Sequence, residues 1–470
     1  MEQWYPVAWA KDVIDLKPLS ITLWDRHCVL FRDRSTGIYV VMDDICPHRA
    51  APLSEGRLYE RETDGEKETV LECGYHGWRF NCDGRCVDIP VVPLEKRIPA
   101  AADVGVVYAT HLSINGLIFM WFGDRLKADE SKIPLPKELV QADESERLFY
   151  RDSFRYFPIS FSTLHENVAD PTHVSWAHHG TGRDNRKTVK RSGGVDIVHE
   201  NLTEGYVHAR KYNQDSSKGW SDIFFQTPTA VHYAIKLGDT KSKIFLLSWT
   251  VPISWDKSKV FTLFSYLNPP KIVRLVKWFS PRWYEHTITN LVLDGDPGML
   301  QKQYAHLQAV ERDGYGSAWK KEYTLASGKW DTSVMKVRQF FDMHGWSMPY
   351  ATPIPSDARS ERILTRVVND RYENHTRECQ ACTAALHNFT RGRTAALVGA
   401  GVSGAAALFS GIVFAALSIG GAAFAPLPLR LAGFGGTVLC ILLLRLAKML
   451  HYFMTLMTYT DIAYDLNHAD

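Results

Sequence analysis

Apolar residues near the N-terminus form short runs that are separated by turn residues. Residues 38–42, 69–72, 106–108 and 117–121 are apolar and rich in Val, Ile, Leu and aromatic side chains, which is typical of strands. The dipeptide Asp83-Gly84 marks a hairpin turn within this region. This pattern predicts a small all-β domain at the start of the chain.

Longer apolar runs begin after residue 148. Residues 243–251 and 260–264 read as neighbouring strands of one antiparallel sheet. The stretch after Pro171 and the stretch 298–310 have helical patterns. Strands and helices that are not strictly alternating predict an α+β domain.

The C-terminal part carries no charged side chain between Arg393 and Arg430, and residues 431–444 form a second apolar run. A bilayer span needs about 20 apolar residues, so two membrane helices with a turn near Pro426 are predicted. The alternative is a buried helical hairpin of a soluble domain. Basic residues flank the start of the first predicted span and the end of the second. By the positive-inside rule, both ends of the hairpin and the domains before it would lie on one side of the membrane. The predicted parts are residues 1–125, a polar linker 126–147, residues 148–370, 371–394, two spans in 395–454 and a tail 455–470.

The composition narrows the class of protein. A chain of 470 residues is long enough for two or three domains. Its 54 basic and 52 acidic residues give a net charge of +2, which leaves no electrostatic footprint for a nucleic acid. Eight cysteines are too few for a disulfide scaffold and favour a reducing compartment. No targeting peptide is visible at the N-terminus, so we expect a protein made where it works or a sequence that lacks its targeting segment.

Two short loops carry the most specific chemistry. Cys46 and His48 lie in one loop, and Cys73 and His76 lie in the other. Two Cys and two His fit a Rieske [2Fe–2S] cluster, and they also fit a closed tetrahedral zinc site. Each loop mixes Cys with His at unequal spacing, whereas zinc fingers keep the Cys pair and the His pair apart. Glycines and prolines in both loops suit tight turns around bridging sulfides, so the cluster is the favoured interpretation.

A second group of candidate ligands follows Glu166. Asp170 and Pro171 predict a helix start, with an N-cap acceptor and then proline at the first position. His173 and His178 would be separated by about 140° on a regular helix, so only a π-bulge or a break would let them share one ion. Two imidazoles and a carboxylate form the ligand triad of non-haem Fe(II) oxygenases. A second metal centre would give the cluster an acceptor for its electron.

Taken together, the two loops and the Asp170-x-x-His173-x-x-x-x-His178 motif resemble the Rieske non-haem iron oxygenases. The resemblance implies that the loops hold a [2Fe–2S] cluster and that His173 and His178 hold a mononuclear Fe(II). It implies a helix-grip catalytic domain built on an antiparallel sheet. The third iron ligand is implied by the stretch Asp296-x-x-x-Leu-x-x-Gln303, which is similar to a helix of the family and favours Asp296 over Asp294.

The resemblance also implies a catalytic role for Asp170. In this family the residue bridges a cluster histidine of one subunit to an iron ligand of the next within a head-to-tail homotrimer. A carboxylate between two imidazoles would fix their tautomers and offer a hydrogen-bonded route for the electron. A simple N-cap role for Asp170 is compatible with this function.

A Cys-x-x-Cys pair, Cys379 and Cys382, precedes the predicted spans. Such a pair can close a disulfide or bind a metal, but no second pair completes a zinc site. Its position before two spans resembles the plant and cyanobacterial subgroup that includes pheophorbide a oxygenase and the Rieske protein of the chloroplast inner-envelope translocon. In that subgroup the pair implies redox control by thioredoxin. Two inert reduced thiols are the alternative.

From the resemblance we expect a membrane-anchored monooxygenase that uses O2 and oxidises a tetrapyrrole, with pheophorbide a as the first candidate. Electrons would come from ferredoxin, because no dinucleotide-binding loop is predicted. The expected location is a chloroplast membrane, inner envelope or thylakoid, with the catalytic domain in the stroma; a cyanobacterial membrane is compatible. The alternatives are oxidation of chlorophyllide or protochlorophyllide, a redox sensor in a translocon, and a membrane electron carrier.

Overall fold

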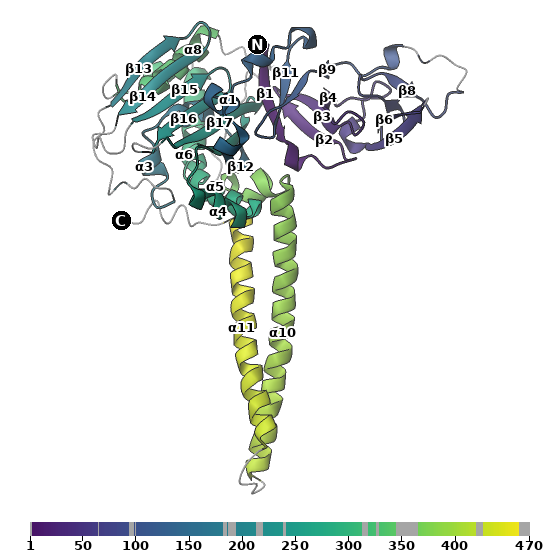
Figure 1. Cartoon of the computed structure of the whole chain (residues 1–470), viewed down its shortest axis with the longest axis vertical. Coiled ribbons are helices and arrows are strands. Elements are labelled where there is room, and N and C mark those ends of the chain that lie inside the picture. The colour runs from purple at the N-terminus through teal and green to yellow at the C-terminus, as the bar shows by residue number, and fades with distance from the viewer. Residues whose placement is uncertain are drawn as a thin grey trace. The chain divides into compact units, whose positions relative to one another are not determined.

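The computed structural model shows two compact units, one within residues 1–369 and the other within residues 370–462 (Figure 1). The residues described are 2–63, 65–93, 98, 100–181, 186, 194–212, 220–237, 241–312, 318–325, 329–344, 365–419 and 426–459.

The N-terminal part of the first unit is all-β, as predicted. Its strands pair antiparallel in three sheets, whose cores are made by apolar runs such as the almost fully buried Leu117–Phe122. The sheets contain β1 (Gln3–Trp9), β11 (Leu117–Phe122) and β10 (Thr110–Leu112); β2 (Leu19–Leu23), β3 (Arg26–Arg32), β4 (Tyr39–Asp43) and β9 (Val107–Tyr108); and β5 (Arg57–Thr63), β6 (Glu66–Glu72), β7 (Arg79–Phe80) and β8 (Cys86–Asp88).

The charged stretch 60–68 falls in the β5–β6 hairpin. Its charges pair across the two strands, as in the contact of 2.7 Å between Arg61 and Glu68. Cross-strand pairs of opposite charge support a ribbon that has little apolar surface to bury.

Residues 126–147 lie along the surface in short helical turns before β12. The turns are η4 (Arg125–Lys127), η5 (Glu130–Lys132), α1 (Lys137–Gln141) and η6 (Glu144–Glu146). The carbonyl of Pro134 accepts hydrogen bonds from Trp249 Nε1 at 3.0 Å and from His232 Nε2 at 3.1 Å. These hydrogen bonds hold the polar segment against the large sheet. The predicted boundaries of this linker, residues 126 and 147, remain a prediction.

A seven-stranded antiparallel sheet organises the rest of the first unit (Figure 1). The strand order is β12-β18-β17-β16-β15-β14-β13, and each strand pairs with its neighbour in sequence except β12, which pairs with β18. The strands are β12 (Arg147–Phe157), β13 (Gly194–Asn201), β14 (Tyr206–Tyr212), β15 (Trp220–Gln226), β16 (Ala230–Lys236), β17 (Lys243–Ser254) and β18 (Lys257–Leu267). The helices are α2 (Phe161–Ala169), α3 (Val174–Ala177), α4 (Lys271–Phe279), α5 (Arg282–Leu293), α6 (Pro297–Arg312), α7 (Ala318–Glu322), α8 (Thr332–His344) and α9 (Thr365–Val368).

The β domain is fixed to this sheet by a buried ion network. Arg282 on α5 donates to both carboxylate oxygens of Asp12 at 2.7 and 2.8 Å, and to Asp152 on β12 at 2.8 Å. Trp9 Nε1 donates to the carbonyl of Ser153 at 3.0 Å. A bidentate guanidinium contact of this kind gives geometric specificity, so the two domains form one unit.

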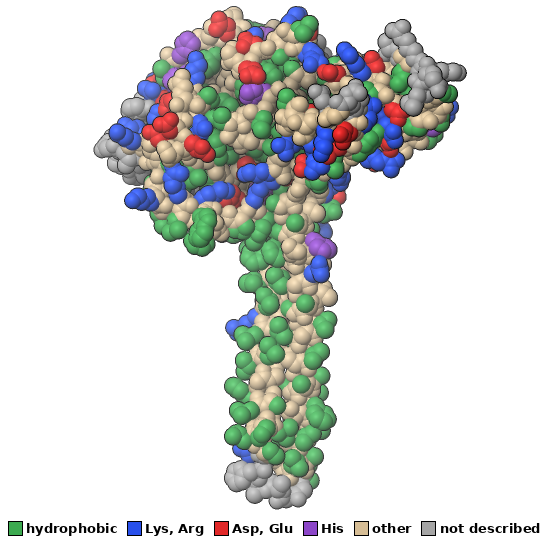
Figure 2. Space-filling view, turned by 45° about the vertical axis from the view of Figure 1, so that its right-hand side comes forward, with side chains coloured by type: hydrophobic (Ala, Val, Ile, Leu, Met, Phe, Trp, Pro, Cys, Tyr) green, Lys and Arg blue, Asp and Glu red, His purple; other side chains and the backbone are tan. Residues whose placement is uncertain are grey.

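The second unit is a helical hairpin. A π-helical turn, η8 (Tyr372–Thr376), leads into α10 (Gln380–Ile419), which packs antiparallel against α11 (Leu427–Met457). Both helices are long and apolar enough to cross a membrane. Their apolar side chains are largely exposed, which argues against the alternative of a buried hairpin, and Figure 2 shows them covering the two helices. Small residues line the contact: a Cβ on Gly436 would lie 3.0 Å from the carbonyl oxygen of Ser403.

Helix α10 begins at Gln380 and runs through Arg391 into the apolar segment without a break. Residues 399–404 match the Gly-x-Gly-x-x-Gly spacing, but they lie inside α10 and not in the strand-to-helix turn in which that motif binds a dinucleotide. The predicted turn near Pro426 falls partly on residues 420–425, which are outside the described residues.

Candidate metal centres

The two cysteine loops have the same backbone design. The N–H of Cys46 donates to the carbonyl of Ala51, and the N–H of Cys73 donates to that of Trp78, both at 2.8 Å. In each loop the fourth residue after the cysteine has a positive φ, 56° at Ala50 and 73° at Gly77. Both loops therefore turn sharply around their cysteine, directly after β4 and β6.

Close approach of the chain holds the second loop against the first. A Cβ on Gly74 would lie 2.8 Å from the carbonyl oxygen of Glu55, which explains the glycine in the motif. Cys46 and Cys73 are buried in the core of the domain, whereas His48 is half-buried and His76 is exposed. The two imidazole rings lie with centroids 4.6 Å apart. The arrangement puts the thiols inside and the imidazoles at the surface.

The chemistry of these side chains fits a cluster of iron and sulfide. Burial raises the pKa of the Cys46 thiol to about 11, with the neighbouring Cys73 adding to the shift, so a cation must stabilise the thiolates. Desolvation and His76 hold the pKa of His48 below its usual value, which keeps the imidazole neutral for a metal. His48 Nδ1 is buried without a hydrogen-bond partner.

Trp78, for which no role was predicted, stacks on the His48 ring with the ring centroids 4.6 Å apart and an interplanar angle of 5°. This stacking fixes the orientation of one candidate ligand. The signal in the sequence is an aromatic residue directly after the second loop's Gly77, but nothing in the sequence alone pairs it with His48.

A second group of ligands meets beside the large sheet. His173 Nε2 lies 3.2 Å from His178 Nε2, and Asp296 Oδ2 lies 3.4 Å from His178 Nε2. Asp296 Oδ1 is 3.8 Å from His173 Nε2. Ligands that occupy adjacent positions at about 2.1 Å from one ion are separated by about 3 Å, so these three residues fit a single metal.

The helix that carries the two histidines is broken, as the spacing requires. Helix α3 has a single turn, with His173 at its N-cap and His178 at its C-cap. The expected helix start at Asp170 is wrong. Asp170 ends α2, and its carboxylate accepts hydrogen bonds from the N–H and hydroxyl of Thr172 at 2.7 and 2.6 Å, which turns the chain before α3.

Contacts around this turn fix the state of both imidazoles. His173 Nδ1 donates to the carbonyl of Asp170 at 2.7 Å, so its Nε2 carries the lone pair. Burial lowers the pKa of His178, and the Asp296 carboxylate opposes that shift. Tyr233 on β16 donates to the carbonyl of Val168 at 2.7 Å and ties the turn to the sheet. This contribution of Tyr233 could not be read from the sequence.

The turn between α5 and α6 distinguishes the two candidate carboxylates. Asp294 is buried in an ion pair with the fully buried Arg155, whereas Asp296 faces the histidines. Gly295 between them packs on α3, where a Cβ would lie 2.1 Å from the carbonyl oxygen of Ala177. Glycine is therefore required at the point where the two ligand-bearing segments meet.

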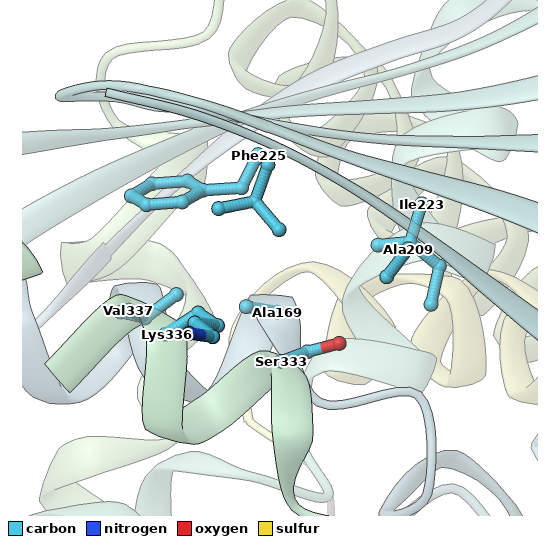
Figure 3. A pocket seen from close by; sticks show the side chains of 8 residues that line it. Ala169, Ala209, Ile223, Phe225, Ser333, Lys336 and Val337 are labelled. Carbon is cyan, nitrogen blue, oxygen red and sulfur yellow. The ribbon is translucent and has the colours of Figure 1, made fainter. Parts of the chain in front are cut away.

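A small hollow lies between the large sheet and α8 (Figure 3). Apolar side chains of β14 and β15 face α8 across it, and Ala169 at the end of α2 closes one side. Pockets for large ligands have volumes of about 300 to 1,000 Å³. The lining is mostly apolar, with Ser333 and Lys336 on α8 as its polar members.

Comparisons with known proteins agree with this geometry. The Rieske [2Fe-2S] domain family matches residues 3–99, and the pheophorbide a oxygenase family matches residues 225–313. The crystal structure of apo dicamba monooxygenase shares the fold, with a TM-score of 0.54 and 20% identity over 73% of this chain and 97% of that chain.

Curated relatives cover most of the chain. Pheophorbide a oxygenase of Oryza sativa subsp. japonica is 30% identical over 412 residues, which cover 83% of this chain and 73% of the relative. Protein TIC 55 of Pisum sativum is 29% identical over 352 residues, or 74% of this chain and 59% of the relative. The fold and its two metal centres are those of a Rieske oxygenase. More narrowly, the chain belongs to the Rieske oxygenase family that includes pheophorbide a oxygenase.

Membership establishes the class of chemistry. The protein is an oxidoreductase with a [2Fe–2S] cluster and a mononuclear iron, and it uses an electron donor, O2 and an organic substrate. Its fold class, an all-β Rieske domain followed by an antiparallel-sheet catalytic domain and two apolar helices, is confirmed.

Proposed function

We propose that the chain is a membrane-anchored Rieske monooxygenase that oxidises a chlorophyll-derived tetrapyrrole, with pheophorbide a as the first candidate and ring opening at a meso carbon as the reaction. The observation that carries this proposal is the match of residues 225–313, around Asp296, to the pheophorbide a oxygenase family. The relative from Oryza sativa supports it along most of the chain.

In this proposal Cys46, His48, Cys73 and His76 hold the cluster, and a mononuclear iron binds at His173, His178 and Asp296. The bound groups supply one-electron transfer and activation of O2. The candidate ligands are at distances from one another that fit this assignment.

The surrounding residues position these ligands. The carbonyl of Asp170 keeps the Nδ1 proton of His173 in place and so presents Nε2 to the iron. The Arg155–Asp294 ion pair fixes the α5–α6 turn from the opposite side. Because Gly295 allows that turn to approach α3, Asp296 reaches the two histidines.

The arrangement of one chain supports the proposal that electrons pass between subunits. Figure 1 shows β6, which leads into the second cluster loop, and α3 at opposite ends of the first unit. A head-to-tail homotrimer would bring a cluster of one subunit to the iron of the next. Asp170, whose side chain is 23% exposed, would then bridge His173 to a cluster histidine of the neighbouring subunit. Mass photometry of the full chain in detergent tests the trimer.

The setting proposed for this enzyme is a chloroplast membrane. The two apolar helices would anchor it, and the relatives from Oryza sativa subsp. japonica and Pisum sativum are chloroplastic proteins. Arg391 and Arg393 lie near the same end of the hairpin as Arg445 and Lys448, because Gly392 contacts Leu450 and Gly399 contacts Leu443 across the helices. By the positive-inside rule the catalytic domain would lie in the stroma, where ferredoxin would supply electrons.

The test is anaerobic incubation of the reduced enzyme with pheophorbide a, chlorophyllide a or protochlorophyllide, followed by O2 and mass spectrometry. The expected result is an oxygenated, ring-opened product from pheophorbide a with the native enzyme and none with Asp296→Ala. Oxidation of chlorophyllide a or protochlorophyllide instead would identify a different tetrapyrrole as the substrate and leave the proposed class of reaction unchanged.

A role as a translocon-associated redox sensor is the second candidate, and the similarity to the protochlorophyllide-dependent translocon component 52 of Arabidopsis thaliana, which is 24% identical, favours it. A sensor predicts cluster oxidation and reduction without oxygenated product from any pigment. The same assay therefore separates the two functions.

A further inference from the structure

A third cluster of metal-binding side chains lies in the second unit. His375, Cys379 and Cys382 bring one imidazole nitrogen and two sulfurs within 4.8 Å of one another. All three residues are at least 98% buried. Burying two thiols and an imidazole at this separation is unusual unless they bind something together.

Local structure aligns the three side chains. They are spaced i, i+4 and i+7 across the junction from η8 to α10, with Cys379 directly before the first residue of α10. His375 belongs to the π-helical turn η8, and the carbonyls of His375 and Thr376 accept from the N–H of Cys379 at 3.1 and 3.2 Å. Single π-helical turns are frequent at functional sites.

The distances fit a tetrahedral ion. Cys382 Sγ lies 3.4 Å from His375 Nε2. With metal–sulfur bonds of about 2.3 Å and metal–nitrogen bonds of about 2.0 Å, the two atoms would be about 3.5 Å apart on zinc. Two thiolates and one imidazole prefer a soft or borderline metal such as zinc over magnesium or calcium.

The surroundings give the site a structural role. The fully buried Arg371 donates to the carbonyl of Leu456, and Thr376 Oγ1 donates to that of Met457 at 2.6 Å. These contacts close the C-terminal end of α11 with residues of the same turn that carries His375. An ion bound at the start of α10 would rigidify the turn whose residues make these two contacts with the end of α11.

We propose that His375, Cys379 and Cys382 bind one zinc ion per chain, distinct from the cluster and the mononuclear iron. The spacing His-x-x-x-Cys-x-x-Cys is the sequence signal for it, with His375 as the ligand that a Cys-x-x-Cys motif alone does not show.

The test is metal analysis of the full chain purified anaerobically in detergent with zinc supplied during growth. The expected content is three irons and one zinc, and Cys379→Ser, Cys382→Ser and His375→Gln each lose the zinc but keep the cluster's paramagnetic signal. Two matched controls should keep the zinc: Cys440→Ser in α11, and His387→Gln at an exposed position of α10.

Two further measurements keep the test decisive if a variant fails to fold. Zinc must persist in Asp296→Ala, which excludes zinc at the iron ligands, and X-ray absorption at the zinc edge must show two sulfur neighbours at about 2.3 Å. A zinc shell without sulfur, or a zinc-free chain whose Cys379 and Cys382 form a disulfide, overturns the proposal. The disulfide result would favour the redox-regulatory role of the pair.

Helix α4 exposes an apolar face. The i, i+3, i+4, i+7 spacing that normally points to a core is followed by Ile272, Leu275, Val276 and Phe279. Here these side chains are 62%, 51%, 49% and 69% exposed, and α4 has no buried residue. Trp278 is 78% exposed beside them.

The polar side of α4 faces the protein instead. Lys277 Nζ contacts both carboxylate oxygens of the fully buried Glu285 at 2.7 and 2.8 Å, and Arg274 donates to the carbonyl of Ser145. The helix has three basic residues and no acidic one. Exposed Trp and Phe with flanking cations are typical of helices that lie in a membrane interface with anionic lipids.

We infer that α4 inserts its apolar face into the surface of the bilayer that the α10–α11 hairpin spans, an inference that rests on the membrane anchoring proposed above. The test places the photoreactive residue benzoylphenylalanine at Phe279 in the full chain, reconstituted in nanodiscs of phosphatidylglycerol and phosphatidylcholine. A lipid adduct is expected there and not at the control position Leu126, which is 89% exposed.

Adducts to a second copy of the chain, or none, would refute the inference for α4. Extraction of native membranes with alkaline carbonate tests the hairpin separately, because a chain without inserted spans is released whatever α4 does. Failure of the anchor and failure of α4 are thus distinguishable.

Discussion

Replacing Gly295 with alanine tests how the iron site is assembled. The added Cβ would lie 2.1 Å from the carbonyl oxygen of Ala177 and 3.0 Å from His178 Nδ1. An ordinary carbon–oxygen contact is well over 3 Å, so the α5–α6 turn and α3 must separate by about 1 Å, beyond the roughly 0.2 Å tolerance of metal–ligand distances. The expected costs are about 1 to 3 kcal/mol of stability from overpacking and iron affinity weaker by at least 10- to 100-fold.

The assay is iron content with the paramagnetic spectrum of the reduced cluster. Gly295→Ala should hold two irons per chain with an unchanged cluster spectrum and no turnover. The control Gly411→Ala, where a Cβ meets open space, should hold three. Three irons and normal turnover in Gly295→Ala would refute the idea that this glycine sets the position of Asp296.

Three further predictions follow from individual contacts. Replacing His48 with Cys should keep an iron–sulfur cluster but lose the Rieske spectrum and lower the potential, and an unchanged spectrum would remove His48 from the ligands. Asp294→Ala should cost about 3 to 5 kcal/mol in denaturant unfolding because Arg155 is left buried and unpaired, and unchanged stability would contradict the ion pair. Burial lowers the pKa of His165 to about 3 in the folded chain, so between about pH 6.5 and pH 3 only the unfolded chain binds this proton. As the pH falls through that window, the free energy of unfolding should decrease by about 1.4 kcal/mol per pH unit. Replacing His165 with Phe should flatten that slope.

The sequence predicted best where the chemistry is local. Cys46, His48, Cys73 and His76 sit in two short loops, so their spacing alone identified the candidate cluster. The strands around them follow from apolar runs whose periodicity is a property of the strand itself.

Contacts between residues far apart in the chain could not be predicted from the sequence. Asp170 reads as a helix start because Asp-Pro usually is one, but the chain turns there because Thr172 and Tyr233 hold it, and Tyr233 comes from a distant strand. The pairing of Arg155 with Asp294 and the approach of Gly295 to α3 depend on tertiary packing. The exposed apolar face of α4 looks in the sequence like an ordinary core-facing helix.

The most direct test of the proposed function is a single turnover of the reduced full chain with pheophorbide a under ¹⁸O2. We predict a ring-opened product that carries one ¹⁸O atom from O2, with no such product from Asp296→Ala. Recovery of unchanged pheophorbide a from a preparation that holds its full iron content and is reoxidised by O2 would contradict it.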